Sequence, residues 1–169
     1  MAKKISLREF QEHLAARLAG ADQRSAAGLL GVQSGTDLWL LNLSDSGEIV
    51  ALAPLTTVPL TQPWFAGIAN IRGKLHSVVD FAAFQGKEPT PQNSSARLLL
   101  IGTRHGSNAA LLVSRMLGLR SVEALTAELD DPLAPVWARA SYRDVHQRHW
   151  KKLNVVALLG DEAFMNIGA

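Results

Sequence analysis

Residues 63–84 read Pro63-Trp-Phe-Ala-Gly67-Ile-Ala-Asn-Ile-Arg72-Gly73-Lys-Leu-His-Ser-Val-Val-Asp80-Phe-Ala-Ala-Phe84. Two apolar runs, Ile68–Ile71 and Leu75–Phe81, lie on either side of Arg72-Gly73-Lys74. Apolar runs of this length around a turn that contains glycine are typical of a β-hairpin. A tight hairpin turn needs a positive φ, which glycine adopts at no steric cost, so we expect one at Gly73.

The same residues partly resemble a phosphate-binding loop. Such a loop has four residues between its glycines, a Ser or Thr after the lysine, and a helix behind it. Here five residues separate Gly67 from Gly73, Leu75 follows Lys74, and strand-like runs lie on both sides. We therefore interpret the stretch as a hairpin and not as a nucleotide site.

Short apolar runs continue outward from the hairpin in both directions, bounded by Gly, Ser, Asp and Pro. The further predicted strands are Leu29–Val32, Leu38–Leu43, Ile49–Leu52, Leu98–Ile101, Ala109–Val113, 115–124 and Val136–Tyr142. Leu98–Ile101 and Ala109–Val113 are apolar throughout, as strands buried on both faces would be. Residues 85–96 form the clearest loop. The pattern predicts a mainly β barrel or sandwich.

A helix is predicted near each end of the chain. Ser6 and Glu9 form a capping box at the start of the first, which we expect over residues 6–19. Its apolar residues recur at helical spacing along one stripe: Leu7, Phe10, Leu14 and Leu18. Two interpretations of this helix stay open, a stripe packed on the barrel or a free docking element. The second helix is expected over Leu153–Phe164.

Composition places the 169 residues in a compact globular class, with 47% hydrophobic and 19% charged residues. The length suits one domain or two small packed halves. There is no cysteine, which excludes disulfides, thiolate metal sites and cysteine nucleophiles. A net charge of +2 provides no overall field that would attract nucleic acid or membrane.

Basic residues are concentrated in segment 139–152. Five of them, against Asp144 alone, give the segment a net charge of 5 − 1 = +4: Arg139, Arg143, Arg148, Lys151 and Lys152. We interpret it as a solvated face. The alternative function is a small-barrel nucleic-acid-binding protein that uses this segment, with nearby aromatic side chains available for stacking on bases. Those side chains are Trp137, Tyr142 and Trp150.

Neither export nor membrane insertion is expected. Charged residues soon follow the start, so no secretory signal is visible. Residues 49–71 lack Asp, Glu, Lys and Arg, but three prolines and several polar residues interrupt them. The expectation is a soluble, cytoplasmic protein without direct membrane insertion.

Catalytic and metal-binding motifs are weak. His146 and His149 could share a helical face, but no third ligand accompanies them and cations surround them. No Gly-x-Ser-x-Gly elbow is present. We expect no catalytic residue, no metal, no cofactor and no enzyme activity. Trp64, between Pro63 and Phe65, is interpreted as a core residue or as an exposed anchor at a protein interface.

The residues Ser46-Gly-Glu48-Ile49-Val, then Gly67-Ile-Ala-Asn70-Ile-Arg72-Gly73, then Val-Val-Asp80-Phe resemble the central block of the CheW-like chemotaxis coupling proteins. That family reads Glu-Ile, a variable stretch, Gly-Val-x-Asn-Leu-Arg-Gly, then Pro-Val-Ile-Asp-Leu, with the same spacing. Residues 97–124 and 153–164 resemble the family's second half and closing helix. The two ends of the chain are most similar to the coupling proteins of type IV pilus twitching motility.

The resemblance implies a mainly β fold of two packed five-stranded β-barrel subdomains, with an added N-terminal helix and a C-terminal helix. It places a helical extension at residues 1–25 and the CheW-like domain at 26–168. It also implies a non-catalytic signal-transduction adaptor. Such an adaptor couples the cytoplasmic tips of methyl-accepting chemoreceptors to the regulatory domain of a CheA-type histidine kinase, here in control of twitching motility.

The predicted partner-binding residues are Glu48, Ile49, Trp64, Gly67, Asn70, Arg72 and Gly73. The resemblance places Glu48 and Arg72 near the receptor-facing surface, and it gives the glycines and Asn70 the task of shaping that surface. Glu48 and Arg72, if they lie on neighbouring strands, can form a charge-assisted pair. Whether that pair contacts a partner or is a plain surface salt bridge stays open.

Overall fold

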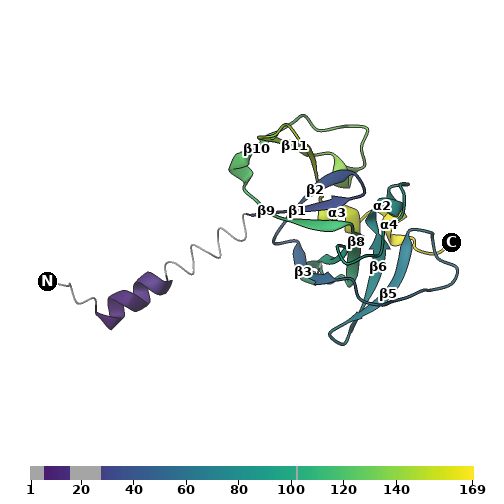
Figure 1. Ribbon diagram of the computed structural model, residues 1–169, viewed down its shortest axis with the longest axis horizontal. Coiled ribbons are helices and arrows are strands. Elements are labelled where there is room, and N and C mark those ends of the chain that lie inside the picture. The colour runs from purple at the N-terminus through teal and green to yellow at the C-terminus, as the bar shows by residue number, and fades with distance from the viewer. Residues whose placement is uncertain (1–5, 16–27, 102) are drawn as a thin grey trace.

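The computed structural model describes residues 6–15, 28–101 and 103–169. Over these residues the chain forms two six-stranded sheets with a few short helices (Figure 1). One sheet, sheet A, follows the order β10 (Leu125–Ala127), β11 (Ser141–Asp144), β12 (His149–Lys152), β2 (Asp37–Asn42), β1 (Leu29–Ser34) and β9 (Arg115–Arg120). Sheet B follows the order β3 (Ser46–Ala51), β7 (Arg97–Ile101), β8 (Ala109–Val113), β6 (Lys74–Asp80), β5 (Phe65–Ile71) and β4 (Leu55–Thr56).

Three apolar clusters account for this shape. The largest contains inward side chains of both sheets, including Leu30 and Val32 of β1 and Leu99 of β7, and it holds the sheets together. The second lies on the other face of sheet B and the third on the other face of sheet A. Each sheet therefore buries both of its faces, as two packed barrels require.

Strands β7 and β8 show this division residue by residue. Leu99, Ile101, Leu111 and Val113 face the cluster between the sheets, whereas Leu98, Leu100, Ala110 and Leu112 face the cluster of sheet B. Successive side chains of a strand point to opposite faces, so only a continuously apolar strand can serve both clusters. The prediction of doubly buried strands is confirmed.

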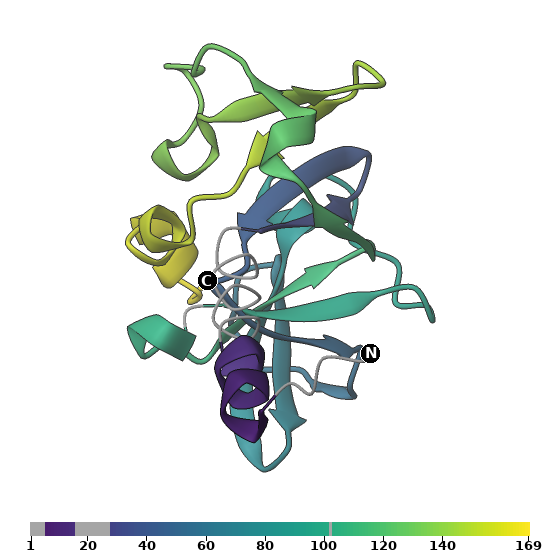
Figure 2. The same cartoon turned by 90° about the vertical axis from the view of Figure 1, so that its left-hand side faces the viewer.

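The mainly β fold predicted from the sequence is confirmed, with six strands in each sheet where the resemblance implied five. The short strands β4 and β10 are included in that number. Two of the pairings, β6 with β8 and β12 with β2, are parallel and join segments far apart in the sequence. Figure 2 shows β10 and β11 at the end of the molecule opposite the β5–β6 hairpin.

Asp80 connects β6 to the short helix α2 (Phe81–Phe84) and is nearly buried. One of its carboxylate oxygens accepts hydrogen bonds from the Ala83 amide (3.3 Å) and the Thr90 hydroxyl (2.7 Å), and the other accepts one from the Thr90 amide (2.8 Å). A buried carboxylate requires such partners. The hydrogen bonds from Thr90 to Asp80 therefore hold the 85–96 loop against the end of the hairpin.

The N-terminal helix is described from residue 7 to residue 15. The predicted capping box is present, because the Glu9 amide donates to the Ser6 hydroxyl (3.2 Å) and the Ser6 amide donates to the Glu9 carboxylate (3.0 Å). All of residues 7–15 are exposed. The predicted continuation to residue 19 lies outside the described residues, as does most of the predicted boundary region around 25.

Two predicted elements differ from the structure near the C-terminus. Val136–Tyr142 is not a strand: Val136–Ala138 forms a 3₁₀ turn, η3, and β11 begins only at Ser141. Pro135, at φ −54°, lacks an amide hydrogen to donate to a ladder and begins that turn instead. The single closing helix is two, α3 (Val155–Leu159) and α4 (Glu162–Met165).

Asp161 explains the break between these two helices, since its carboxylate accepts a hydrogen bond from the Phe164 amide (3.1 Å) and caps α4. The predicted strand over 115–124 is also shorter. It ends at Arg120, and a second 3₁₀ turn, η2 (Val122–Ala124), follows. A third, η1 (Thr103–His105), lies between β7 and β8.

A candidate partner-binding surface at the β5–β6 hairpin

The turn between β5 and β6 consists of two residues, Arg72 and Gly73, since Ile71 pairs directly with Lys74. Both have positive φ, 52° for Arg72 and 82° for Gly73. Positive φ at both central residues is the geometry of the type I′ hairpin turn. The Asn70 side-chain oxygen accepts a hydrogen bond from the Gly73 amide (2.9 Å). The positive φ predicted at Gly73 is confirmed, and that of Arg72 was not foreseen.

Arg72 and Glu48 form an ion pair, with 2.5 Å between Arg72 Nη2 and Glu48 Oε1. Glu48 lies on β3, which β7 and β8 separate from β6 in the ladder. The pair therefore forms although the two residues do not lie on neighbouring strands of the ladder. They meet because sheet B curls, so that the tip of the hairpin returns to the strand at the sheet's far edge.

A hollow of about 350 Å³ lies beside this ion pair. It is lined by Gly47, Glu48, Ile71, Arg72, Lys74, His76, Leu100 and Thr103. The His76 side chain is buried, and its Nδ1 has no hydrogen-bond partner among the described residues. Sequence analysis did not single out His76. The signal was available in the two-residue alternation of β6, which puts residue 76 on the same face as the buried Val78.

Gly67 and Ile49 lie inside the fold, within strands β5 and β3. Gly67 is buried within β5 with φ 133°, and a Cβ there would lie 2.5 Å from the Thr56 carbonyl oxygen. It thus allows β4 to approach β5 closely. Ile49 is half-buried and packs on the cluster between the sheets. Of the seven predicted residues, Glu48, Asn70, Arg72 and Gly73 are brought together at the tip of the hairpin.

Trp64 lies elsewhere, because it precedes β5 and the hairpin tip follows that strand. Eight residues of extended chain correspond to about 25 Å at about 3.3 Å per residue. Trp64 is half-buried and its ring packs edge-on against Phe84, with 5.0 Å between ring centroids. Its burial is thus intermediate between that of a core residue and that of an exposed one, and its role as an anchor for a partner stays a prediction.

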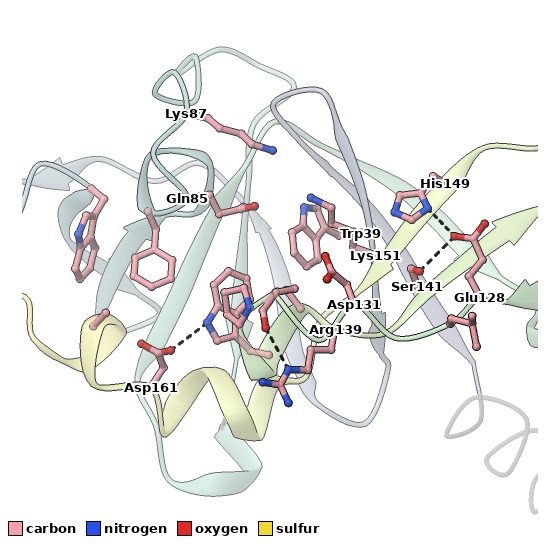
Figure 3. A pocket seen from close by; sticks show the side chains of 18 residues that line it. Trp39, Gln85, Lys87, Glu128, Asp131, Arg139, Ser141, His149, Lys151 and Asp161 are labelled. Atoms are coloured by element: carbon pink, nitrogen blue, oxygen red, sulfur yellow. Dashed lines mark hydrogen bonds and ion pairs between the residues drawn. The ribbon is translucent and has the colours of Figure 1, made fainter.

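Trp64 lines a second, larger cavity of about 770 Å³, shown in Figure 3. Trp39, Phe84 and Trp137 contribute aromatic walls, and the Trp137 indole donates a hydrogen bond to Asp161 (3.2 Å). Trp39 and Trp137 stack with 6.0 Å between centroids. Sequence analysis missed this cavity, because segments from both sheets line it and no local pattern brings them together.

Cations at the rim of this cavity are paired with Asp37. The ammonium groups of Lys87 and Lys151 both contact its carboxylate, Lys151 at 3.3 Å. Burial acts to raise the pKa of Asp37, but the hydrogen bonds and charges of the two lysines outweigh it and leave that pKa below its ordinary value.

The basic segment 139–152 is not a face of free positive charge. Arg143 pairs with Glu128 (2.5 Å) and Arg148 with Asp144 (2.8 Å), and His149 also contacts Glu128 (2.9 Å). Carboxylates thus neutralise much of this segment, although the side chains of Arg143, Arg148 and His149 remain 43%, 46% and 47% exposed. Two of the three aromatic side chains that the nucleic-acid alternative would use for stacking are withdrawn from solvent, since Trp150 is fully buried and Trp137 nearly so, while Tyr142 is half-buried.

His149 therefore contacts a carboxylate, while His146 lies in the turn before it. Within residues 6–15, 28–101 and 103–169, no group of three or more His, Asp or Glu side chains has the arrangement of a metal site. Among the same residues, no helix has the length and apolar character needed to cross a bilayer.

Comparison with known proteins defines the class. The family model for the CheW-like domain matches residues 28–161, and the chain belongs to this family of chemotaxis-type coupling proteins, whose members are non-catalytic scaffolds. The chain is similar to Protein PilI of Pseudomonas aeruginosa, with 26% identity over 91 residues, which make up 54% of this chain and 51% of PilI. The similarity thus spans about half of that relative's length.

The solved structure of scaffolding protein TtCheW from Thermoanaerobacter tengcongensis has the same fold. It superposes with a TM-score of 0.65 and 18% sequence identity, covering 76% of this chain and 89% of TtCheW. The resemblance stated from residues 46–81 is confirmed at the level of family and fold.

Proposed function

We propose that this protein is a cytoplasmic, non-catalytic adaptor that couples the tips of methyl-accepting chemoreceptors to the regulatory domain of a CheA-type histidine kinase. The observation that carries the proposal is the tip of the β5–β6 hairpin, where Arg72 is held in a left-handed conformation with its guanidinium against Glu48. Control of type IV pilus twitching motility is proposed on the similarity to PilI, over about half of its length.

The left-handed backbone conformation of Arg72 is unfavourable in free energy for any residue with a side chain. A left-handed conformation costs a residue other than glycine about 1–2 kcal/mol. The side chain of Arg72 is 75% exposed, and a salt bridge this exposed contributes only about 0–1 kcal/mol. Stability alone would favour glycine or asparagine at this position. Strained residues of this kind cluster at functional sites, which supports a binding role for the arginine.

The guanidinium is also suited to contact a partner. It is planar, always charged, and carries five N–H donors, of which the single Glu48 oxygen uses few. A carboxylate or a row of carbonyl oxygens on a receptor tip can accept hydrogen bonds from the remaining N–H groups. The hollow beside it, with His76 in its wall, gives room for a side chain of that partner.

An adaptor needs a surface for each of two partners, and the predicted residues fall into two places. We assign the tip of the hairpin to the receptor and the Trp64 cavity to the kinase domain. Aromatic side chains in a partly enclosed pocket are frequent anchors of protein interfaces. Gly67 and Ile49 support the first surface from inside the fold.

Titration calorimetry with a purified receptor tip tests the first assignment. We expect Arg72→Glu to weaken binding by about ten- to a hundredfold, because charge-assisted hydrogen bonds contribute about 1.5–3 kcal/mol each. Lys152→Glu is the matched control, since it makes the same change of charge on β12 of sheet A and should leave the affinity unchanged. Thermal unfolding of both variants establishes that each is folded.

The comparison with Arg72→Asn separates binding from stability. Asparagine tolerates the left-handed conformation, so this variant should be at least as stable as the wild type and still bind weakly. Wild-type affinity in both Arg72 variants would remove the hairpin surface from the proposal. Failure to bind receptor or kinase, together with salt-sensitive retention of DNA, would instead support the nucleic-acid alternative.

A further inference from the structure

The N-terminal helix carries an apolar stripe without a partner among the described residues. Leu7, Phe10 and Leu14 recur at helical spacing and are 75%, 58% and 49% exposed. Isolated helices shorter than about 12–15 residues are marginal in water, and most helical stability in proteins comes from packing of one face. A surface that covers this stripe would therefore stabilise the helix, whose described residues, 7 to 15, are all exposed.

An exposed apolar patch lies along the edge strand β9 and the 3₁₀ turn η2 that follows it. We define the edge patch as Met116, Leu119 and Val122, which are 46%, 69% and 50% exposed. Strand β9 is the last strand of sheet A, and no further strand of the described chain pairs with its outer side. Large apolar side chains on an open strand edge are unusual in a monomer unless something covers them.

The register shows which face of the sheet this patch extends. Met116 pairs with Val32, and Leu119 pairs with Leu30. Directly paired residues in an antiparallel ladder point to the same face, and Leu30 and Val32 both belong to the core between the sheets. A bulge in this pairing inserts one extra residue between Met116 and Leu119, which keeps both on that face. Met116 and Leu119 therefore lie at the open end of the main core, and Val122 follows them in η2.

The chain enters the domain beside this patch, as the position of β1 next to β9 in Figure 1 shows. Leu29, the first residue of β1, pairs with Arg120. Thirteen Cα steps separate residue 15 from residue 28 and can span about 45 Å at about 3.3–3.6 Å each. Even a helix that continues to residue 19 leaves nine steps, or about 30 Å. Adjacent strands lie only about 5 Å apart, so the helix can reach the patch easily.

We propose that the stripe Leu7, Phe10 and Leu14 docks in cis on the edge patch of β9 and closes the open end of the core between the sheets. The connection within one chain gives the helix a high effective concentration at the patch, in the millimolar range for short linkers. The chain's own helix therefore occupies the patch in preference to a second copy at ordinary protein concentrations. This docking makes the helix part of the folded domain.

The methionines of the chain make the proposal testable by NMR of ¹³C-methyl-methionine in the full-length protein. Met116 lies in the edge patch, while Met165 lies in α4, outside it, and serves as the internal reference. Phe10→Ser removes the centre of the stripe. Glu12→Ser is the matched control, because it makes the same replacement in the same helix on the side away from the stripe.

We expect Phe10→Ser to move the Met116 methyl resonance toward its position in an unfolded chain, while Glu12→Ser leaves it in place. In the reverse direction, Leu119→Ser should lower hydrogen-exchange protection of amides 10–15 by about tenfold, because undocking removes the packing from which most helical stability comes. A Met116 resonance that is identical in wild type and Phe10→Ser would overturn the proposal. So would a shift that appears only as protein concentration rises, since that would assign the patch to a second copy.

Discussion

Two glycines of the central hairpin both have positive φ but differ in how closely other atoms surround them. Around Gly73 a Cβ would meet no atom within 4 Å, whereas at Gly67 it would lie 2.5 Å from the carbonyl oxygen of Thr56. The first glycine serves only the conformation of the turn. The second also permits the contact of β4 with β5, which no side chain could allow without movement of the backbone.

Alanine substitutions at these two positions should therefore differ in their effect on stability. Gly73→Ala should lower the free energy of unfolding by about 1–2 kcal/mol, the cost of the left-handed conformation. Gly67→Ala should lower it by about 2–4 kcal/mol, because overpacking against backbone adds to the strain. Urea denaturation of both variants measures the difference. Equal losses would show that β4 can move away at little cost.

At the scale of elements, the β11–β12 hairpin is fixed by Asp144. Its carboxylate accepts hydrogen bonds from the Trp150 indole (2.9 Å), from the amides of Arg148 and His146, and from the Arg148 guanidinium (2.8 Å). Burial opposes the charge, but these donors outweigh it and hold the pKa of Asp144 well below the ordinary 3.8. Just after the neighbouring strand β10, Glu128 accepts a hydrogen bond from Arg143 that lowers its pKa below the ordinary 4.5.

These pKa shifts predict that sheet A becomes less stable as the solution is made acidic. A carboxylate whose pKa is lowered by folding contributes stability that is complete above its ordinary pKa and is lost as pH falls toward the folded value. The urea midpoint should therefore be flat from neutral pH down to about 5 and should decrease below the ordinary values of 4.5 and 3.8.

Asp144→Asn provides the test, since asparagine does not titrate. This variant should be less stable than the wild type at pH 7 and should lose a smaller part of its urea midpoint between pH 5 and pH 3. Asp130→Asn, in the exposed loop that follows β10, is the control and should keep the wild-type acid response. The same loss in Asp144→Asn as in the wild type would contradict the assignment to this carboxylate.

Elements specified by local chemistry could be predicted from the sequence. The capping box of Ser6 and Glu9, the turn at Gly73 and the doubly buried strands β7 and β8 all depend on residues within a few positions of one another. Val136–Tyr142 was misread because a short apolar run does not reveal that Pro135 starts a turn. The parallel pairings β6–β8 and β12–β2 depend on long-range packing, for which the local pattern has no signal.

For the whole molecule, the curl of sheet B decides which of the predicted residues lie close together. It returns the tip of the hairpin to β3 and so joins Arg72 to Glu48 across two intervening strands. The resemblance to the family led to the prediction of this pair, whereas the order of the strands in the sheet would have placed its two residues far apart. The same architecture takes Trp64 to the far end of β5, into a cavity formed by both sheets. Neither His76 nor the walls of that cavity were predicted, because their significance depends on tertiary neighbours.

Two separated surfaces on one small domain agree with an adaptor that holds two partners at once. Sedimentation velocity of the protein mixed with a receptor tip and the kinase regulatory domain tests this claim most directly. We predict a complex that contains all three components. It should lose only the receptor tip on Arg72→Glu and only the kinase domain on Trp64→Ala. If the receptor tip and the kinase domain instead displace each other from the protein, they share one surface, and the account of an adaptor with two surfaces is contradicted.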